Sequence, residues 1–176
     1  MKKIIAFAGS NSKNSINKKL AAYVADKISN VESEILDLND YELPLYGIDY
    51  EEAQGIPENA KLFLDKIKSS DGVIVSLAEH NGNFSVAFKN IYDWMSRVDG
   101  KLWNNKPMLL MATSPGERGG ASVFDIAKNT FPRMGADLVA EFLLPSFISN
   151  FSENELSDSN LNDQLNLEIK NFEKAI

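Results

Sequence analysis

The sequence has no cysteine, and this absence removes several kinds of chemistry at once. Disulfides, thiolate nucleophiles and cysteine metal sites are excluded, and the chain does not fit the pattern of a disulfide-stapled secreted domain. Histidine occurs only once, at His80. Because structural and catalytic zinc sites draw on several cysteines and histidines, we expect no metal centre.

Long hydrophobic runs are also missing, since no stretch approaches the roughly 20 apolar residues of a membrane span. The opening MKKIIAFAGS has the lysines and apolar residues of a secretory signal, but its apolar run, Ile4 to Ala8, is too short for a signal core. We interpret this run as a buried first strand. The sequence therefore predicts a cytoplasmic protein that does not enter a membrane.

The chain also lacks an excess of positive charge: 18 lysines and arginines stand against 25 aspartates and glutamates, and the formal net charge is -7. Proteins that hold nucleic acids or anionic membranes need clustered cations, so neither is an expected partner. The chain has 176 residues, 44% hydrophobic and 24% charged, which suits one folded domain over residues 1–176. A small molecule is the expected partner.

Short apolar runs alternate with amphipathic segments along the chain. The runs cover residues 3–8, 32–38, 72–78, 106–113 and 136–144. Helical spacing of apolar residues predicts helices over 15–29, 57–69, 85–97, 120–134, with Gly135 as its C-terminal cap, and 160–175. The polar segment 151–166 is expected to be an exposed loop leading into the last helix.

This alternation predicts an α/β fold in three layers, a doubly wound sandwich with a five-stranded parallel sheet in the order 2-1-3-4-5. Such sheets bind ligands beyond the carboxyl ends of the strands, where the strand order reverses. Three loops lie at that edge: GSNSKNS after the first strand, EHNGNFS after the third and TSPGERGG after the fourth.

The first loop has two interpretations. Its serines and asparagines could hold a phosphate at the start of a helix, where free amides and the helix dipole favour an anion. Alternatively, Ser15 or Asn14 is only a helix cap. The loop lacks both G-x-x-x-x-G-K-[ST] and G-x-G-x-x-G, which disfavours a nucleoside triphosphatase and a dinucleotide-fold hydride enzyme.

Two further protein classes are disfavoured by the residues at this edge of the sheet. No G-x-S-x-G elbow precedes a helix, which argues against a Ser-His-Asp hydrolase. A phosphoacceptor receiver domain would have acidic residues after the first strand, where this chain has Gly9 and Ser10. The three glycines of the third loop permit a close backbone approach to a flat ligand, or form a mobile turn.

Taken together, these stretches resemble the NADPH-dependent FMN reductase family of flavodoxin-like proteins, which includes quinone, chromate and azo-dye reductases. GSNSKNSINKKLA is similar to the family's G-S-x-R-x-x-S-x-N start, and LPLYGID to its L-P-L-Y-x-x-D segment. AEHN stands for P-E-Y-N, FKNIYDWMSR for L-K-N-A-I-D-W-x-S-R, and KPMLLMATSPGERGG for the fourth strand and glycine loop. The resemblance covers residues 3 to about 140.

The resemblance implies which residues bind FMN. Around the phosphate it places Ser10, Ser12, Ser15, Ile16 and Asn17. Along the isoalloxazine edge and face it places Glu79, His80, Asn81 and Gly82. On the other side of the ring it places Ser114, Pro115, Gly116, Arg118, Gly119 and Gly120.

The resemblance also implies an NAD(P)H oxidoreductase. Hydride would pass from NAD(P)H to FMN, and electrons would then pass to a quinone-like, azo or other small acceptor, with no catalytic side chain. Arg118 is a candidate for the phosphate of the nicotinamide cofactor. The family forms dimers or tetramers through the helix over 88–97, so we expect one apolar face of that helix to meet a partner chain. Its apolar residues are Phe88, Ile91, Tyr92, Trp94 and Met95.

Three residues depart from the family pattern, and two alternatives to the reductase stay open. Ser12 stands where the family has an arginine, which removes a charge-assisted contact unless Lys13 or Lys18 replaces it. Ala78 replaces a proline and His80 a tyrosine. These changes motivate one alternative, a flavin-free family member that acts as a binding or regulatory subunit. The other alternative is a flavodoxin-like electron carrier, which binds FMN but takes electrons from a protein.

Overall fold

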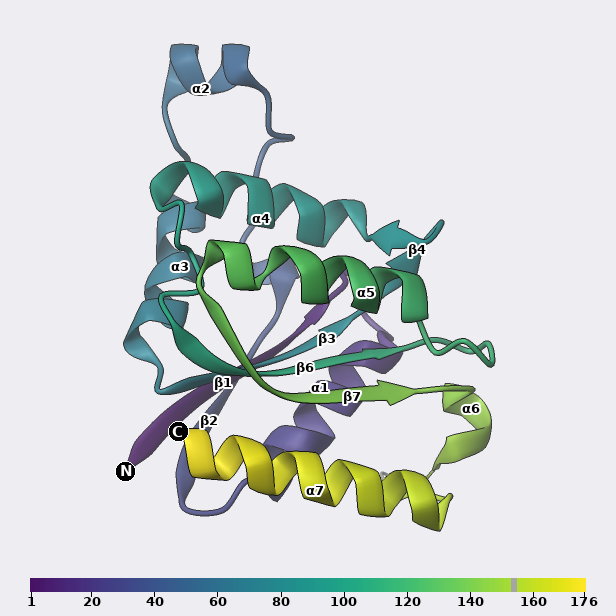
Figure 1. Cartoon of the computed structure of the whole chain (residues 1–176). Coiled ribbons are helices and arrows are strands. Elements are labelled where there is room, and N and C mark those ends of the chain that lie inside the picture. Colours follow the sequence, from purple (N-terminus) through teal and green to yellow (C-terminus); the bar gives the residue numbers. More distant parts are fainter. Residues whose placement is uncertain (153–154) are drawn as a thin grey trace.

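A sheet of five parallel strands forms the centre of the computed structural model, which describes residues 1–152 and 155–176 (Figure 1). All five strands are those that the apolar runs predict. They are β1 (Lys2–Gly9), β2 (Val31–Leu36), β3 (Gly72–Leu77), β6 (Lys106–Thr113) and β7 (Ala136–Leu144). Their order, β2-β1-β3-β6-β7, confirms the predicted 2-1-3-4-5 topology.

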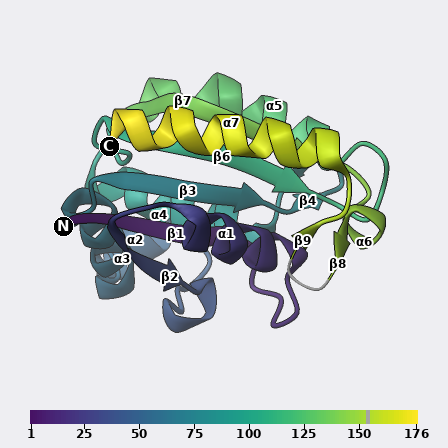
Figure 2. The same ribbon diagram turned by 90° about the horizontal axis from the view of Figure 1, so that it is seen from below.

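Helices cover both faces of the sheet (Figures 1 and 2). One face carries α3 (Glu58–Ser69), α4 (Val86–Val98) and α5 (Ala121–Thr130), and the other carries α1 (Ile16–Lys27) and α7 (Ser159–Ala175). Because strand side chains alternate in direction, Val73 and Val75 pack on the first face and Ile74 on the second. Within the described residues, no helix has the length and apolar character that crossing a membrane requires.

The register of the strands sets the three loops side by side. Gly9 at the end of β1 pairs with Leu77 at the end of β3. Leu77 in turn pairs with Ala112, one residue before the end of β6. The chain therefore leaves the sheet at neighbouring points after β1, β3 and β6, as the sequence predicts.

The helix expected over 120–134 ends earlier than predicted. It stops as α5 at Thr130, because Pro132 has no N–H to continue the helical hydrogen bonds. A 3-10 turn, η2 (Pro132–Met134), follows, and Gly135, with φ at 87°, caps it as predicted.

The expected loop over 151–166 is wrong in part. Two short strands, β8 (Phe151–Ser152) and β9 (Glu155–Leu156), pair antiparallel at its start, and α7 begins at Ser159 with Asp158 as its N-cap. Residues 153–154 of this expected loop lie outside the described residues.

The expectation that α4 offers an apolar face to a partner chain is wrong for the residues named. All of them are buried within one chain: Phe88, Ile91, Tyr92, Trp94 and Met95. The segment before α2 (Ile48–Gln54) covers Trp94, whose indole Nε1 donates to the Pro44 carbonyl at 2.8 Å. The rings of Tyr46 and Tyr50 meet the indole edge-on at 4.9 and 5.8 Å. Helix α2 itself stands off the body of the fold and buries no residue (Figure 1).

Two leucines of α3 test this packing. Leu64 is 1% exposed and Leu62 is 46% exposed on the same helix. We expect Leu64→Ala to lower the free energy of unfolding by about 2–5 kcal/mol, because it leaves a cavity beside the sheet. Leu62→Ala is the matched control and should change it by no more than about 0.5 kcal/mol. Urea unfolding of both variants checks this; equal effects would contradict the described core.

Candidate functional site

The loops after β1, β3 and β6 line a shallow pocket of about 290 Å³ at the carboxyl end of the sheet. Of the residues that the resemblance assigns to FMN, those lining this pocket are Ser10, Ser12, Ser15, Ile16, Asn17, Glu79, His80, Ser114 and Pro115. Farther along the second and third loops lie Asn81, Gly82, Gly116, Arg118 and Gly119. The pocket also includes residues that the sequence analysis did not assign to it, namely Asn14, Ala78 and Thr113.

The first loop presents backbone amides at the start of α1. Ser15 is the N-cap, and its Oγ accepts a hydrogen bond from the Lys18 amide at 3.2 Å. The helix-cap interpretation is therefore correct, but it leaves the hydroxyl hydrogen of Ser15 available. In the described part of the chain, the amides of Ile16 and Asn17 have no acceptor. Free amides at the positive end of a helix dipole form an anion site.

Cations contribute little to this site. The ammonium of Lys18 pairs with the carboxylate of Asp37, so it is not aimed at the pocket. Partial burial opposes ionisation of Asp37, but hydrogen bonds from Lys18 and Asn39 outweigh it and hold the pKa of the carboxyl below its usual value. Ser12, in place of the family's arginine, lines the pocket as a neutral hydroxyl. Neutral groups therefore form most of the anion cradle.

The second loop is a tight hairpin formed by β4 (Glu79–His80) and β5 (Asn83–Phe84). The turn residues Asn81 and Gly82 have φ values of 52° and 74°, the left-handed conformations that a two-residue hairpin requires. The carboxylate of Glu79 accepts a hydrogen bond from the Val123 amide at 3.1 Å. Glu79 thus caps α5, whose N-cap residue is a glycine, and it joins the second loop to the end of the third.

The third loop depends on glycine where it approaches the end of β7. Gly119 has φ at 60°, and a Cβ added there would lie 2.9 Å from the Leu144 carbonyl oxygen. Two backbone hydrogen bonds hold the loop in place: the Ser146 amide donates to Gly116 at 2.9 Å and the Phe147 amide donates to Ser114 at 3.0 Å. The short helix α6 (Phe147–Asn150) begins at this anchor. The loop is therefore fixed in shape and is not a free turn.

Buried polar side chains connect the ends of these strands. The side-chain amide of Asn17 bonds to Ser76 in β3 and to both backbone groups of Thr113 in β6. The Thr113 hydroxyl donates to the Leu144 carbonyl at 2.7 Å, and the Ser85 hydroxyl donates to the Gly9 carbonyl at 2.8 Å. This network was not predicted from the sequence, although a serine and a threonine at the ends of apolar strands were a visible signal of it.

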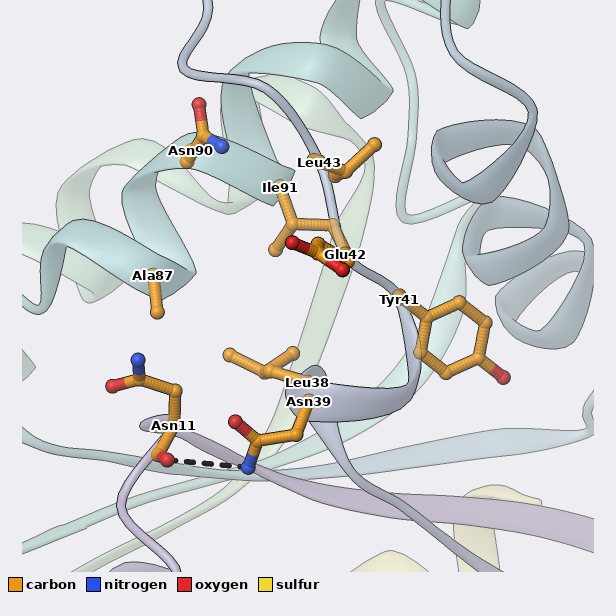
Figure 3. Close-up of a pocket in the computed structure, with 9 residues that line it drawn as sticks. All are labelled: Asn11, Leu38, Asn39, Tyr41, Glu42, Leu43, Ala87, Asn90 and Ile91. Atoms are coloured by element: carbon orange, nitrogen blue, oxygen red, sulfur yellow. Dashed lines mark hydrogen bonds between the residues drawn. The ribbon is translucent and has the colours of Figure 1, made fainter.

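A second pocket, of about 340 Å³, lies between Asn11 of the first loop, the segment 38–43 and α4 (Figure 3). The side-chain Nδ2 of Asn39 donates to the Asn11 carbonyl at 3.1 Å and so connects the pocket wall to the first loop. The side chain of Glu42 points into this pocket from the segment before α2 (Figure 3). This second pocket includes a residue from only one of the three loops, so the pocket that all three loops line is the better cofactor site.

Comparison with known proteins identifies the family of this chain. The model of the NADPH-dependent FMN reductase family matches residues 2–147. The chain belongs to this family. The match runs from β1 to the start of α6, and so includes all three loops.

Individual FMN reductase relatives agree with that assignment. A quinone reductase from Escherichia coli (strain K12) is 30% identical over 119 residues, which cover 67% of this chain but only 63% of that protein. An NADPH azoreductase from Bacillus sp. (strain OY1-2) is 31% identical over 139 residues, 74% of each chain. Among solved structures, the flavoenzyme NAD(P)H:(acceptor) oxidoreductase FerB from Paracoccus denitrificans has a TM-score of 0.76 at 26% identity. That superposition covers 99% of this chain and 97% of FerB.

The residues of this FMN reductase family member fit the cofactor that the family name gives. The cradle of the first loop suits a phosphate, because Ile16 and Asn17 offer unpaired amides and Ser10 and Ser12 offer hydroxyls. The glycines of the third loop leave room for backbone to approach a flat ring. The pocket joins these two features, as a flavin nucleotide requires.

Two glycines of the third loop provide a matched test. We expect Gly119→Ala to lower the free energy of unfolding by about 1–3 kcal/mol, because alanine would strain the backbone and press on Leu144. Gly116→Ala should have almost no effect, since an added Cβ there has only the Ser114 hydroxyl within 4 Å, at 3.9 Å. Thermal unfolding of the two variants compares them. A harmless Gly119→Ala would refute the described loop anchor.

The two roles of the first loop can be separated at Ser15. Replacing Ser10 and Ser15 together by alanine should raise the FMN dissociation constant by roughly tenfold or more, because hydrogen bonds to a charged group are lost. Ser15→Asp keeps a strong helix cap but places a carboxylate against the phosphate. We expect it to weaken FMN binding at a nearly unchanged melting temperature.

Flavin fluorescence titration measures these constants. Ser69→Ala, at the exposed end of α3, is the control and should bind FMN as the unmodified protein does. FMN affinity unchanged in both loop variants would place the phosphate elsewhere.

Proposed function

We propose that this protein is an FMN-dependent NAD(P)H oxidoreductase that passes electrons to a quinone-like, azo or other small acceptor. One observation carries the proposal: in a member of the FMN reductase family, the three ligand-type loops converge on one pocket beside the free amides of α1. The names of the relatives, a quinone reductase and an azoreductase, support these acceptor classes.

FMN supplies the hydride-accepting ring in such a reaction, so the protein needs no nucleophile or metal. The chain's own task is to bind and orient. We assign the phosphate to the amides of Ile16 and Asn17 and to the hydroxyls of Ser10, Ser12 and Ser15. We assign the ring to the hairpin Glu79–Gly82 and to the third loop, with Ser114, Pro115, Gly116 and Gly119.

The anchors of the ring loops support this assignment. Glu79 holds the second loop against α5, and backbone bonds hold the third loop against the start of α6. Loops that are held in this way can keep backbone amides aimed at a ring that gains negative charge, which is the arrangement that stabilises a reduced product. His80 is exposed beside them, at the rim of the pocket.

For the nicotinamide cofactor we propose Arg118. Its guanidinium donates to the Ser122 hydroxyl at 2.9 Å and is otherwise exposed, so it can meet a phosphate without losing an ion pair. NAD(P)H is an intracellular metabolite, and we therefore propose a cytoplasmic reaction.

We also propose that the chain acts as a homodimer or homotetramer. The buried residues of α4 are not available for the contact, but apolar side chains beside them are exposed: Leu45 is 73% exposed and Val86 is 70% exposed. Both line a pocket of about 250 Å³ between the segment before α2 and the start of α4, whose rim includes Lys89 and Asp93. A second copy of this chain would cover that surface.

The test is reduction of bound flavin under nitrogen. After loading with FMN, the protein should lose its visible absorbance on addition of NADPH or NADH, and regain it when a benzoquinone is added. Protein that carries Ser15→Asp is the matched control and should bleach no faster than free FMN.

The rival functions give different results in the same experiment. Absence of bleaching with either nicotinamide would refute the reductase and favour an electron carrier. Protein that retains no FMN would refute it as well and favour a binding subunit.

A further inference from the structure

The side chain of Asn17 is committed to the interior of the protein. Asn17 lies in the first turn of α1 and is only 2% exposed. Its Oδ1 accepts from the Ser76 hydroxyl at 2.7 Å and from the Thr113 amide at 3.1 Å, and its Nδ2 donates to the Thr113 carbonyl at 3.1 Å. Both lone pairs of the oxygen are therefore in use. Turning the amide toward the pocket would break all three bonds.

These bonds cross from the helix to two strands. Asn17 pairs with Thr113 through two hydrogen bonds, as a neighbouring strand would, and Ser76 adds the end of β3. The three residues are buried and neutral, so each group depends on the others for a partner. The network ties the start of α1, where the free amides lie, to the strand that leads into the third loop.

We propose that Asn17 is a positioning residue for the phosphate cradle: its side chain sets the place of the first turn of α1 relative to β3 and β6. Its contribution to phosphate binding is then indirect, through the backbone amides of Ile16 and Asn17. The inference rests on the proposed function of the first loop, because it concerns the same FMN phosphate.

Ser76 makes the inference testable without touching the ligand. Its hydroxyl holds Asn17 but does not line the pocket. If Asn17 positions the cradle, Ser76→Ala should raise the FMN dissociation constant roughly fivefold and Asn17→Ala about tenfold or more. The double variant should bind FMN no worse than Asn17→Ala alone, because both changes remove the same support.

Riboflavin, which lacks the phosphate, supplies a readout that general loosening would not give. Its dissociation constant should stay within about twofold of the unmodified value in every variant. Ser70→Ala is the control for a lost buried hydroxyl: Ser70 is 2% exposed, and its hydroxyl donates to the Ile67 carbonyl in α3, just before β3 begins and so at the opposite end of that strand from Ser76. It should lower the melting temperature without changing either dissociation constant.

The outcomes separate the proposals. Unchanged FMN affinity in Ser76→Ala beside weakened affinity in Asn17→Ala would refute positioning and make the Asn17 side chain a direct ligand. Equal losses for FMN and riboflavin would refute it in favour of general destabilisation. Unmodified protein that binds both flavins equally would refute the proposed phosphate site and the role of Asn17 together. Where Asn17→Ala does not fold, Ser76→Ala alone still decides the question.

Discussion

A buried amide holds the functional end of this protein together. The hydrogen bonds of Asn17 join the first turn of α1 to the ends of β3 and β6, and the Thr113 hydroxyl extends the connection to β7. Parallel strands contribute apolar packing along most of their length, but at their carboxyl ends the chain turns away and backbone groups need new partners. Neutral side chains supply them here, without the desolvation of a buried charge.

The same preference for neutral groups extends to the candidate cofactor pocket. Lys18 is paired with Asp37, and serines, asparagines and amides line the pocket around the start of α1. An anion in such a cradle is held by oriented dipoles and hydrogen bonds, whose strength depends on geometry. Anion binding at this site therefore depends on the positions of the loops. The net charge of the whole chain, -7, does not provide it.

Most of the fold was predictable because burial on both faces leaves a strong signal. The strands that became β3 and β6 are nearly continuous apolar runs, and their order followed from alternation with helices. Helix α2 gave no such signal because it buries nothing. The hairpin of β4 and β5 has two residues per strand, too few for an alternating pattern.

The candidate site was predictable as a set of loops, but the direction of single side chains was not. Asn17 and its partners Ser76 and Thr113 are separated by 59 and 96 positions in the chain. Only the strand register brings them together. In the same way, the apolar residues of α4 could be recognised in the sequence, but what covers Trp94 depends on the path of the segment before α2.

That path leaves α2 without a buried residue, and two of its side chains still reach the body of the fold: Glu51 pairs with Arg97 of α4, and the Tyr50 ring packs against Trp94. The Pro44 carbonyl accepts from Asn90 and Trp94, and the Asn90 side chain accepts in turn from the Tyr46 amide. Beyond these anchors the helix has no buried residue whose loss would open the core. Substitutions at the other positions of α2 therefore open no cavity in the core, so sequence in this projection can vary as long as Tyr50 and Glu51 keep their contacts with α4.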